Sequence, residues 1–392
     1  MSTMSTNPMV EAPRLYGFPR ADGRVGLRDH TLVLSAVALA NRWAVLAAEG
    51  SGALVVAGES LRGLRGGDAE RQEALIAALV GHPNVGRALV LTQDAPTANR
   101  LRETLDAAGR PVEVMALLRQ SGMSGAVDAA REALGDLSAS QNERIEVGYE
   151  ALCVALECGG SDPTSALASN AAIGRFVDRV IDAGGTAIVS ETVEFIGAEP
   201  VVAERTPDEG VRRAILDAIA ERERWHEEDG EDYRGVNPTA ENIEGGLTTL
   251  VEKSMGAVVK TGTRPFRGAL GFGERPARPG LHFMDTPFFT PLSLTGMAAA
   301  GANLTLFGLG QFNPSAIPLV PTVKVCGNAG TVARWADAID VDASVVTSGK
   351  ATLDEVADRI AQTVQAVSRG ERNAAERWNE GQIVWPRENP PL

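Results

Sequence analysis

The stretch TLVLSAVALANRWAVLAAEGSGALVVA, from Thr31 to Ala57, contains the pattern that decides the fold. Thr31–Val37 and Ala53–Ala57 are continuous apolar runs, which are typical of buried strands, and Asn41–Glu49 between them has the apolar spacing of a helix. Strands that are apolar on both faces and are joined by helices belong to parallel sheets with helices on either side. This stretch therefore predicts an α/β fold.

The same alternation extends through most of the chain. Further strands are expected at Arg87–Leu91, Val112–Leu117, Ala151–Leu156, Thr186–Ser190 and Thr322–Val325. Further helices are expected at Asp68–Val80, Pro96–Ala108, Gly125–Leu137, Asn170–Ala183, Pro207–Asp229, Thr331–Ile339 and Leu353–Ser368. The sequence thus predicts two doubly wound, Rossmann-like domains, of which the second is larger and has long loops rich in Gly and Thr.

Shifts in composition predict the domain boundaries. Residues 1–13 have no periodic pattern and are expected to form a disordered tail. A small α/β domain at 14–140 ends near a polar stretch, and a larger C-terminal α/β domain at 141–392 is expected to carry most of the site. Within it, Gly235–Pro321 is rich in Gly, Thr and Pro and is expected to be largely irregular, which in a compact domain usually indicates function.

Composition excludes several classes of protein. The chain of 392 residues has 37 Lys and Arg against 51 Asp and Glu, so its net charge of −14 disfavours nucleic-acid binding. With only four His and three Cys, it is neither a zinc-finger array nor a disulfide scaffold. The sequence predicts a cytoplasmic protein with reduced thiols, because no secretory signal and no membrane-spanning apolar run is visible.

Two polar segments suit anion binding. Arg20–Arg28 (RADGRVGLR) combines three Arg with two Gly, and Arg24 and Arg28 are candidate substrate-binding residues because guanidinium groups bind carboxylates in a bidentate manner. The alternative, which composition favours, is an Asp-Gly turn with ion pairs between domains. Cys158-Gly-Gly-Ser161-Asp162 follows a predicted strand, where ligands bind in open α/β sheets, or else forms a tight turn with an Asp cap.

Carboxylates and ammonium groups mark two further segments. Ser190–Glu194 (SETVE) places Glu191 and Glu194 directly after a strand, where they could bind a divalent cation or act as a general base, although Glu runs are more often solvated. Asn237–Ser254 contains Gly-Gly-Leu-Thr248-Thr249 and Lys253, and Lys260 follows. Hydroxyl and ammonium groups suit a carboxylate or polyol, and the alternative is a helix cap with surface Lys.

His282–Pro287 (HFMDTP) and Pro321–Asn328 (PTVKVCGN) each place a polar group beside an apolar strand. Asp285 and Lys324 are the candidate site residues in these two segments. Taken singly, each segment is more readily explained as structural than as catalytic.

Together these segments resemble the altronate/galactarate dehydratase family, which also contains the large subunit of sulfolactate sulfo-lyase. The matching motifs occur in the family's order and cover most of the chain: RADGRVGLRDHTLVL, ECGGSDPTSALASN, SETVEFIGAE, NPTAENIEGGLTTLVEKSMGAVVKTGT, GLHFMDTP, TGMAAAGANLTLF and PTVKVCGN. The resemblance implies a lyase that eliminates water or sulfite from a hydroxycarboxylic acid. It also implies a divalent metal, iron(II) or manganese(II), an oligomer, and a small partner domain on a separate subunit.

The chemistry of elimination assigns roles to these candidates. Proton removal next to a carboxylate needs cationic stabilisation, for which we expect Lys253 and Lys260, and a base, for which we expect Glu191 or Glu194. The expected substrate contacts are Arg24, Arg28, Ser161, Asp162, Thr248, Thr249 and Lys324. The expected metal ligands are Cys158, Glu191 and Asp285.

Several family positions for His and Cys carry other residues here. A Gly-Cys-Glu ending is replaced by Thr92-Gln93-Asp94, and a His after Gly-Ala-Glu is replaced by Pro200. The loss of soft ligands should weaken iron binding most. Two alternatives therefore stay open: a metal-free member that performs a different reaction on a carboxylate substrate, and a non-catalytic scaffold or sensing subunit.

Overall fold

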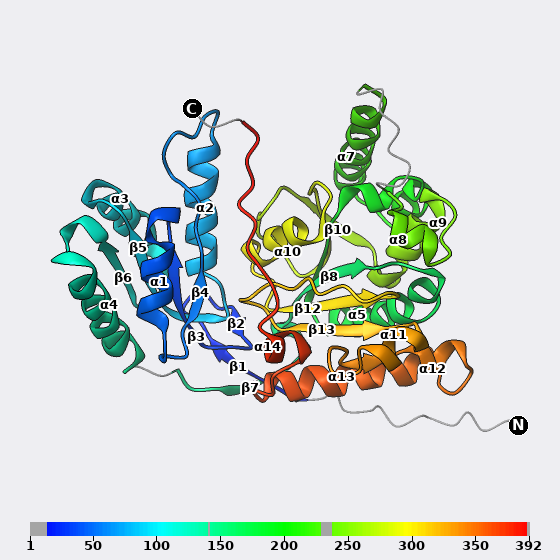
Figure 1. The fold of residues 1–392 in the computed structure, drawn as a ribbon. Helices are drawn as coiled ribbons and strands as arrows, with labels where there is room; N and C mark the ends of the chain where they lie inside the picture. The colour runs from blue at the N-terminus through cyan, green and yellow to red at the C-terminus, as the bar shows by residue number, and fades with distance from the viewer. Residues whose placement is uncertain (1–13, 140–141, 229–236, 390–392) are drawn as a thin grey trace, which may run out of the picture.

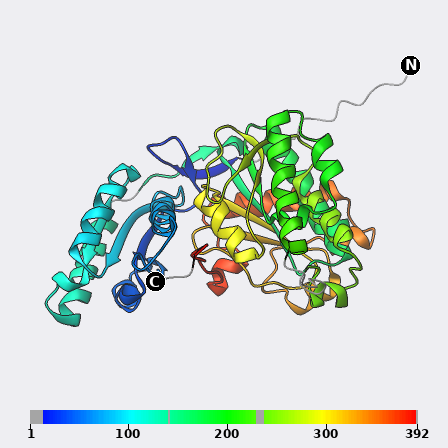
Figure 2. The same ribbon diagram turned by 90° about the horizontal axis from the view of Figure 1, so that it is seen from above.

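The structure is a computed structural model that describes residues 14–139, 142–228 and 237–389. It is an α/β protein with two parallel sheets, which lie in two halves of the molecule side by side (Figures 1 and 2). The tail expected at residues 1–13 lies outside the described residues. None of the helices in the described part of the chain is both long and apolar enough to span a membrane.

The smaller half contains a four-stranded parallel sheet of order β4-β3-β5-β6. Its strands are β3 (His30–Ser35), β4 (Leu54–Val56), β5 (Val85–Thr92) and β6 (Val112–Ala116). Alternate residues of β3 and β5 enter two different cores. One core contains α1 (Asn41–Ala48) and α4 (Gly122–Ser138), and the other contains α2 (Asp68–Val80) and α3 (Ala95–Leu105). Helices therefore cover both faces, as the apolar runs predict.

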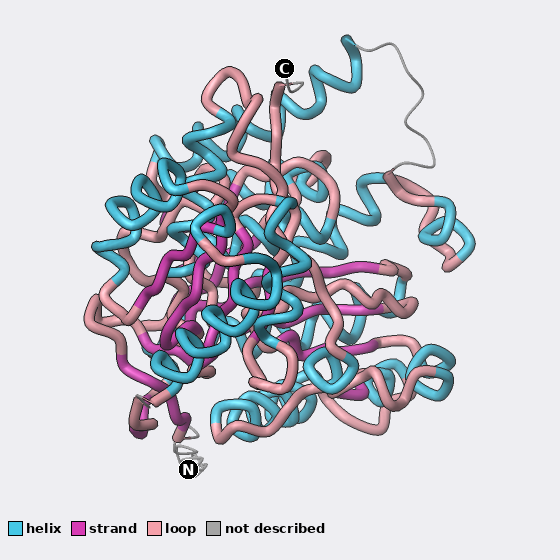
Figure 3. The backbone as a smooth tube through the Cα atoms, turned by 60° about the vertical axis from the view of Figure 1, so that its left-hand side comes forward, coloured by secondary structure: helices cyan, strands magenta, loops and turns pink. Residues whose placement is uncertain are grey.

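The larger half contains a seven-stranded parallel sheet of order β10-β11-β9-β8-β12-β13-β14. Figure 3 shows the strands of the protein in magenta among the surrounding helices. Its strands are β8 (Cys153–Gly159), β9 (Thr186–Val189), β10 (Phe266–Leu270), β11 (Gly280–Met284), β12 (Leu304–Leu309), β13 (Thr322–Cys326) and β14 (Val341–Asp342). On one face pack α5 (Asn170–Asp182) and α13 (Leu353–Ser368), and on the other packs α10 (Thr290–Ala299). The remaining helices are α6 (Glu199–Glu204), α7 (Glu209–Glu228), α8 (Ala240–Glu244), α9 (Leu250–Val258), α11 (Ala329–Arg334), α12 (Ser344–Thr347) and α14 (Ala374–Trp378).

Two expectations about local structure are wrong. Gly235–Pro321 is not largely irregular, since it contains β10, β11, β12 and three helices. On β11 and β12, whose residues are all buried, Gly280, Thr305 and Gly308 interrupt the apolar pattern, and a buried strand needs no polar alternation. The helix expected at Thr331–Ile339 ends at Arg334, after which the backbone of Trp335 leaves the helical conformation.

Three features connect the halves. A small antiparallel sheet joins β1 (Leu15–Pro19) to β2 (Val25–Gly26) and β7 (Ile145–Val147) at the junction. One hydrophobic core contains residues of both halves, among them Leu75 of α2 and Met297 of α10. The C-terminal segment then runs back from α14 between the halves (Figure 1), where the indole of Trp385 donates a hydrogen bond to the carbonyl of Ala57.

Candidate functional site

The candidate site lies where β8 and β9 end. In the sheet, β8 lies between β9 and β12, so the strands that follow it in the sequence are added on both of its sides and the strand order reverses here. Ligands of open α/β sheets bind outside the carboxyl ends of the strands at such a reversal. Glu157 and Cys158 end β8, and Glu191 follows β9. The order of the strands therefore brings together residues that are far apart in the sequence.

A cavity of about 330 Å³ opens at this edge. Glu191, Glu194, Glu241, Cys158 and Lys253 contribute its charged and thiol groups. The rest of its lining is mostly glycine, aromatic rings and neutral polar side chains: Gly159, Gly160, Ser161, Thr239, Asn242, Phe288, Thr290, Gln311, Phe312, Asn313 and Pro314. The cavity is the size of a small organic molecule and offers both polar and apolar surface.

Three buried carboxylates form the centre of the site. Glu157, Glu191 and Glu194 each offer an oxygen, and these atoms lie within 4.8 Å of one another. Glu157 accepts hydrogen bonds from the backbone N–H of Cys158 (3.0 Å) and the hydroxyl of Ser293 (2.5 Å). Glu191 Oε1 is buried and has no hydrogen-bond partner among the described residues. An unpaired carboxylate oxygen in such a place needs an explanation, such as a proton or a ligand.

Lys260 and Cys158 pair with one of these carboxylates. Lys260, which is fully buried, places Nζ 2.7 Å from Glu194 Oε2 and 3.0 Å from Cys158 Sγ. The Cys158 thiol in turn donates to Glu194 at 3.3 Å. Burial, and then the charge of Glu194, raise the pKa of Cys158 to about 12, so this group is a thiol. Burial alone would lower the pKa of Lys260, but Cys158 and the carboxylates hold it well above its usual value.

The surroundings shift the pKa values of the three carboxyl groups in different directions. Burial, reinforced by the charges of Glu157 and Glu194, raises the pKa of Glu191 well above its ordinary value. Burial also raises the pKa of Glu157 to about 7. For Glu194 burial acts in the same direction, but the ammonium groups of Lys260 and Lys253 outweigh it and the pKa is lowered. At neutral pH Glu194 is therefore ionised, and it lies beside a Glu191 whose pKa is raised.

Lys253 supplies a cation to the cavity wall. It lies on α9, is 6% exposed, and donates one hydrogen bond to Asn237 Oδ1 at 2.7 Å. Its Nζ also lies 5.3 Å from the centre of the Phe288 ring. Because an ammonium group has three donors, this Lys has donors left for a bound anion.

The carboxylate triad fits a divalent metal ion. Three oxygen ligands within 4.8 Å, one of them without a protein partner, suit a cation that prefers oxygen. Of the expected ligands, Glu191 belongs to the triad, whereas Cys158 uses its thiol on Glu194. Asp285 accepts from the Thr192 hydroxyl (2.6 Å) and pairs with Arg222 (3.0 Å), away from the triad.

Other predicted residues near the cavity have structural contacts of their own. Ser161 lines the cavity. Asp162 uses its carboxylate on the hydroxyl of Thr164 and the amide of Asn328, and lines a smaller neighbouring cavity. Thr249 caps α9, and Thr248 is bonded to Glu252 of the same helix, with both Thr exposed. These two contacts match the alternative interpretation as a helix cap.

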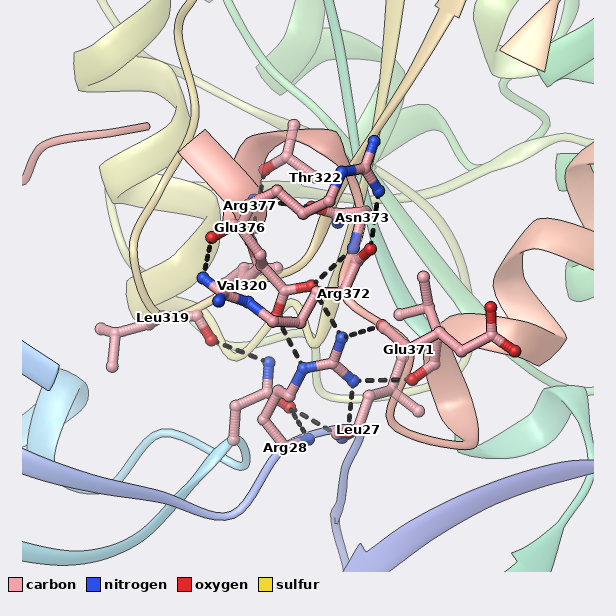
Figure 4. Close-up of polar contacts among 12 residues, drawn as sticks. Leu27, Arg28, Leu319, Val320, Thr322, Glu371, Arg372, Asn373, Glu376 and Arg377 are labelled. Carbon is pink, nitrogen blue, oxygen red and sulfur yellow. Dashed lines mark hydrogen bonds and ion pairs between the residues drawn. The ribbon is translucent and has the colours of Figure 1, made fainter. Parts of the chain in front are cut away.

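The structure places three predicted binding residues outside the cavity. Arg24 is paired with Asp22 and donates to the carbonyl of Gly81. Arg28 reaches from the small half to Glu376 at 2.7 Å (Figure 4) and also donates to the carbonyls of Val367 and Glu371. These contacts match the alternative of ion pairs at a domain junction. Lys324 is fully buried, is paired with Glu380, and lies beneath the ring of Phe312.

Sequence analysis did not single out Glu157. Its signal is a carboxylate within the apolar run ALCVALECGG, on a strand that is buried along most of its length. Charged residues are almost never fully buried unless they are paired or functional. A buried strand that carries one Glu near its carboxyl end is therefore a usable sign of a site.

Comparisons with known proteins agree with the motifs. Residues 149–390 match the family model "D-galactarate/Altronate dehydratase, C-terminal", and residues 17–142 match "D-galactarate dehydratase/Altronate hydrolase, second domain". The (2R)-sulfolactate sulfo-lyase subunit beta of Chromohalobacter salexigens is 30% identical over 95% of this chain and 96% of its own length. The altronate dehydratase of Escherichia coli is 29% identical over 92% of this chain and 75% of its own length. The galactarate dehydratase (L-threo-forming) of the same organism is 28% identical over 61% of this chain and 46% of its own length.

Proposed function

The chain belongs to the D-galactarate/altronate dehydratase family and is a lyase of the dehydratase type, and we propose that it removes water or sulfite from a small hydroxycarboxylic acid in the cavity beside Glu191 and Glu194. The observation that carries this proposal is the pair of carboxyl groups on one cavity wall with oppositely shifted pKa values. Such pairs separate the acid from the base in acid–base catalysis.

The two carboxyl groups divide the elimination between them. Glu194, which is ionised, takes the proton from the carbon next to the substrate carboxylate, and that electron pair forms the new C=C bond. The bond to the leaving hydroxyl breaks, and Glu191 donates its proton so that water departs. The resulting enol becomes a 2-oxo acid. For a sulfonate substrate, the C–S bond breaks instead and sulfite leaves.

Three further groups prepare the substrate and the base. Lys253 binds the substrate carboxylate with its free donors and stabilises the charge that develops there. Neutral side chains such as Asn242 and Gln311 suit hydroxyl groups of the substrate. Lys260 acts from behind the cavity wall, because it is fully buried, and keeps Glu194 ionised.

The carboxylate triad would hold a divalent metal ion, with Glu157, Glu191 and Glu194 as ligands. When bound, manganese(II) or iron(II) would supply a Lewis acid for developing negative charge. Its binding would remove the proton that Glu191 otherwise holds, so the proton donation by Glu191 described above belongs to the metal-free site. A metal-free site is a second candidate, since the ammonium group of Lys260 already lies 2.7 Å from Glu194. Thermal unfolding with chelator and with added Mn²⁺ separates the two, because only a binding site raises the melting temperature.

Two finer points belong to the same proposal. The name of one relative, subunit beta, supports a further subunit for this enzyme. Co-purification of the chain with the proteins that neighbouring genes encode would test this. The strand orders and the helices on both sheet faces support two doubly wound domains, with boundaries near 14–140 and 141–392.

Product formation tests the proposed function. Altronate, galactarate and (2R)-sulfolactate, the substrates named for the relatives, are offered to the purified chain with its partner subunit, and 2-oxo acid and sulfite are measured. We expect Glu191→Gln and Glu194→Gln each to lower kcat by about 100-fold or more, in line with the contribution of general acid–base groups. Glu204→Gln, on an exposed residue of α6, is the control and should match the wild type. Full activity in both cavity variants would refute the assignment.

A further inference from the structure

The backbone at Glu191 has an unusual conformation. Its φ is 61°, and the only other described residue besides glycine with positive φ is Asn379. Asn tolerates the left-handed region, whereas a Glu there costs about 1–2 kcal/mol. Such a conformation persists only where neighbouring groups hold it.

This conformation brings Glu191 and Glu194 together. In an extended strand, residues three apart would be separated by about 10 Å. Here the chain turns directly after β9, and the N–H of Glu194 donates to the carbonyl of Glu191 at 2.8 Å. As a result, carboxylate oxygens of both residues belong to the cluster within 4.8 Å. The triad therefore depends on the turn that begins at Glu191.

Thr286, after β11, is the residue that holds this turn. Its hydroxyl oxygen accepts the N–H of Glu191 at 3.0 Å and shares a hydrogen bond with the Ser190 hydroxyl at 2.5 Å. Its backbone carbonyl accepts the N–H of Thr192 at 3.2 Å, and its own N–H donates to the Thr192 hydroxyl at 3.2 Å. Thr286 is fully buried and is not part of the cavity lining. It contacts the acid's backbone on both sides without reaching the substrate.

We infer that Thr286 is a positioning residue, which holds Glu191 in the left-handed conformation and so aims its carboxyl group at Glu157 and Glu194. This inference rests on the proposed function, since it gives Thr286 its importance through Glu191. Without the hydroxyl, the N–H of Glu191 loses its acceptor, and the backbone relaxes out of the left-handed region.

Matched Thr variants test the role. Thr286→Val removes the hydroxyl at nearly constant volume, and Thr286→Ser restores it. Thr305→Val is the control, because Thr305 is also fully buried but its hydroxyl has no partner within the described part of the chain. If Thr286→Val fails to fold, Thr286→Cys, whose thiol is a weak acceptor, replaces it.

Two measurements give the result without any substrate. In crystals of Thr286→Val we expect the φ angle of Glu191 to become negative. In Mn²⁺ titrations we expect this variant to bind Mn²⁺ 10- to 100-fold more weakly, as for other residues that orient metal ligands. For Thr286→Ser and Thr305→Val we expect a weakening of about 3-fold or less. An unchanged Glu191 backbone in Thr286→Val overturns the inference and leaves the proposed function intact. If the wild type binds no Mn²⁺, the metal proposal fails instead, and the conformation of Glu191 alone decides.

Discussion

At the scale of single residues, neighbouring carboxyl groups differ in what surrounds them. Glu194 has an ammonium group at 2.7 Å and a thiol at 3.3 Å, both of which stabilise its charge. Glu191 Oε1 has no partner among the described residues, so burial dominates. One short turn thereby carries two carboxyl groups whose pKa values are shifted in opposite directions.

The pH dependence of turnover should show both groups. Activity should fall below the lowered pKa of Glu194, where the base is protonated, and above the raised pKa of Glu191, where the acid has lost its proton. In Lys260→Met the acidic limb should move to higher pH, because Lys260 is what keeps the Glu194 pKa low. Initial rates across the pH range measure both limbs, and an acidic limb that stays in place in this variant would contradict the role of Lys260.

The stability of the metal-free protein should fall as the pH rises. Burial raises the pKa of Glu157 from 4.5 to about 7, so the folded state binds more protons than the unfolded state between these values. This stabilisation is fully present below pH 4.5 and is lost as the pH passes 7. Urea unfolding should therefore show a smaller decline in Glu157→Gln, whereas Glu204→Gln should decline like the wild type.

Sequence analysis singled out two of the three carboxylates and the two Lys near them, but not Glu157. Clusters such as SETVE and the two Lys stand out because charge follows apolar strands directly. Glu157 was missed because one Glu inside a strand does not change its apolar pattern. The left-handed turn at Glu191 was also beyond prediction, since its cause is a hydroxyl 95 residues away in sequence.

At the scale of elements, local signals explain which parts were predictable. The helices expected at Asp68–Val80 and Leu353–Ser368 have these bounds in the structure, the latter because Thr352 and Glu355 form a capping box. The strands β10, β11 and β12 carry Gly, Thr and His among their apolar residues. Neither the alternation of a half-buried strand nor the three-to-four spacing of a helix therefore appears in their sequences. β11 and β12 find their places in the sheet by pairing with β9 and β8, which are distant in sequence.

Arg28, which follows β2, is bound to Glu376 of α14 and to the carbonyls of Val367 and Glu371, and its loss should cost stability and not substrate binding. Removing one partner of a largely buried ion pair costs about 3 kcal/mol or more. We expect Arg28→Met to show this loss in urea unfolding with an unchanged KM. Arg14→Met removes an exposed pair with Glu146 and should cost less than about 1 kcal/mol. A raised KM without lost stability would instead support Arg28 as a binding residue.

At the scale of the whole molecule, the C-terminal segment fastens one half to the other. Trp385 is 7% exposed within the shared core. Beyond it, the N–H groups of Glu388 and Asn389 donate to Asp68 of α2 at 3.2 and 3.0 Å, and Arg387 pairs with Glu59. The halves are thus joined both at the antiparallel sheet and at this segment.

Trp385→Ala should weaken that connection by about 3–5 kcal/mol, the usual cost of removing a buried Trp. Trp385→Phe should cost about 1 kcal/mol, because it loses mainly the hydrogen bond to Ala57. Trp378→Ala is the control, since that side chain is 58% exposed. Urea midpoints and protease sensitivity of the small half measure the effect, and equal midpoints for the two Ala variants would contradict it.

The C-terminal segment also imposes an order on biosynthesis. Trp385 is separated from Ala57 by 328 residues, and Asn389 from Asp68 by 321. Since domains fold as they emerge from the ribosome, both sheets can form before this segment has been translated. The nascent protein therefore exposes part of the apolar surface of α2 and α10 until the segment around Trp385 has been translated and has packed there. A chaperone that binds apolar surface would find its target there, and completion of the segment would remove it.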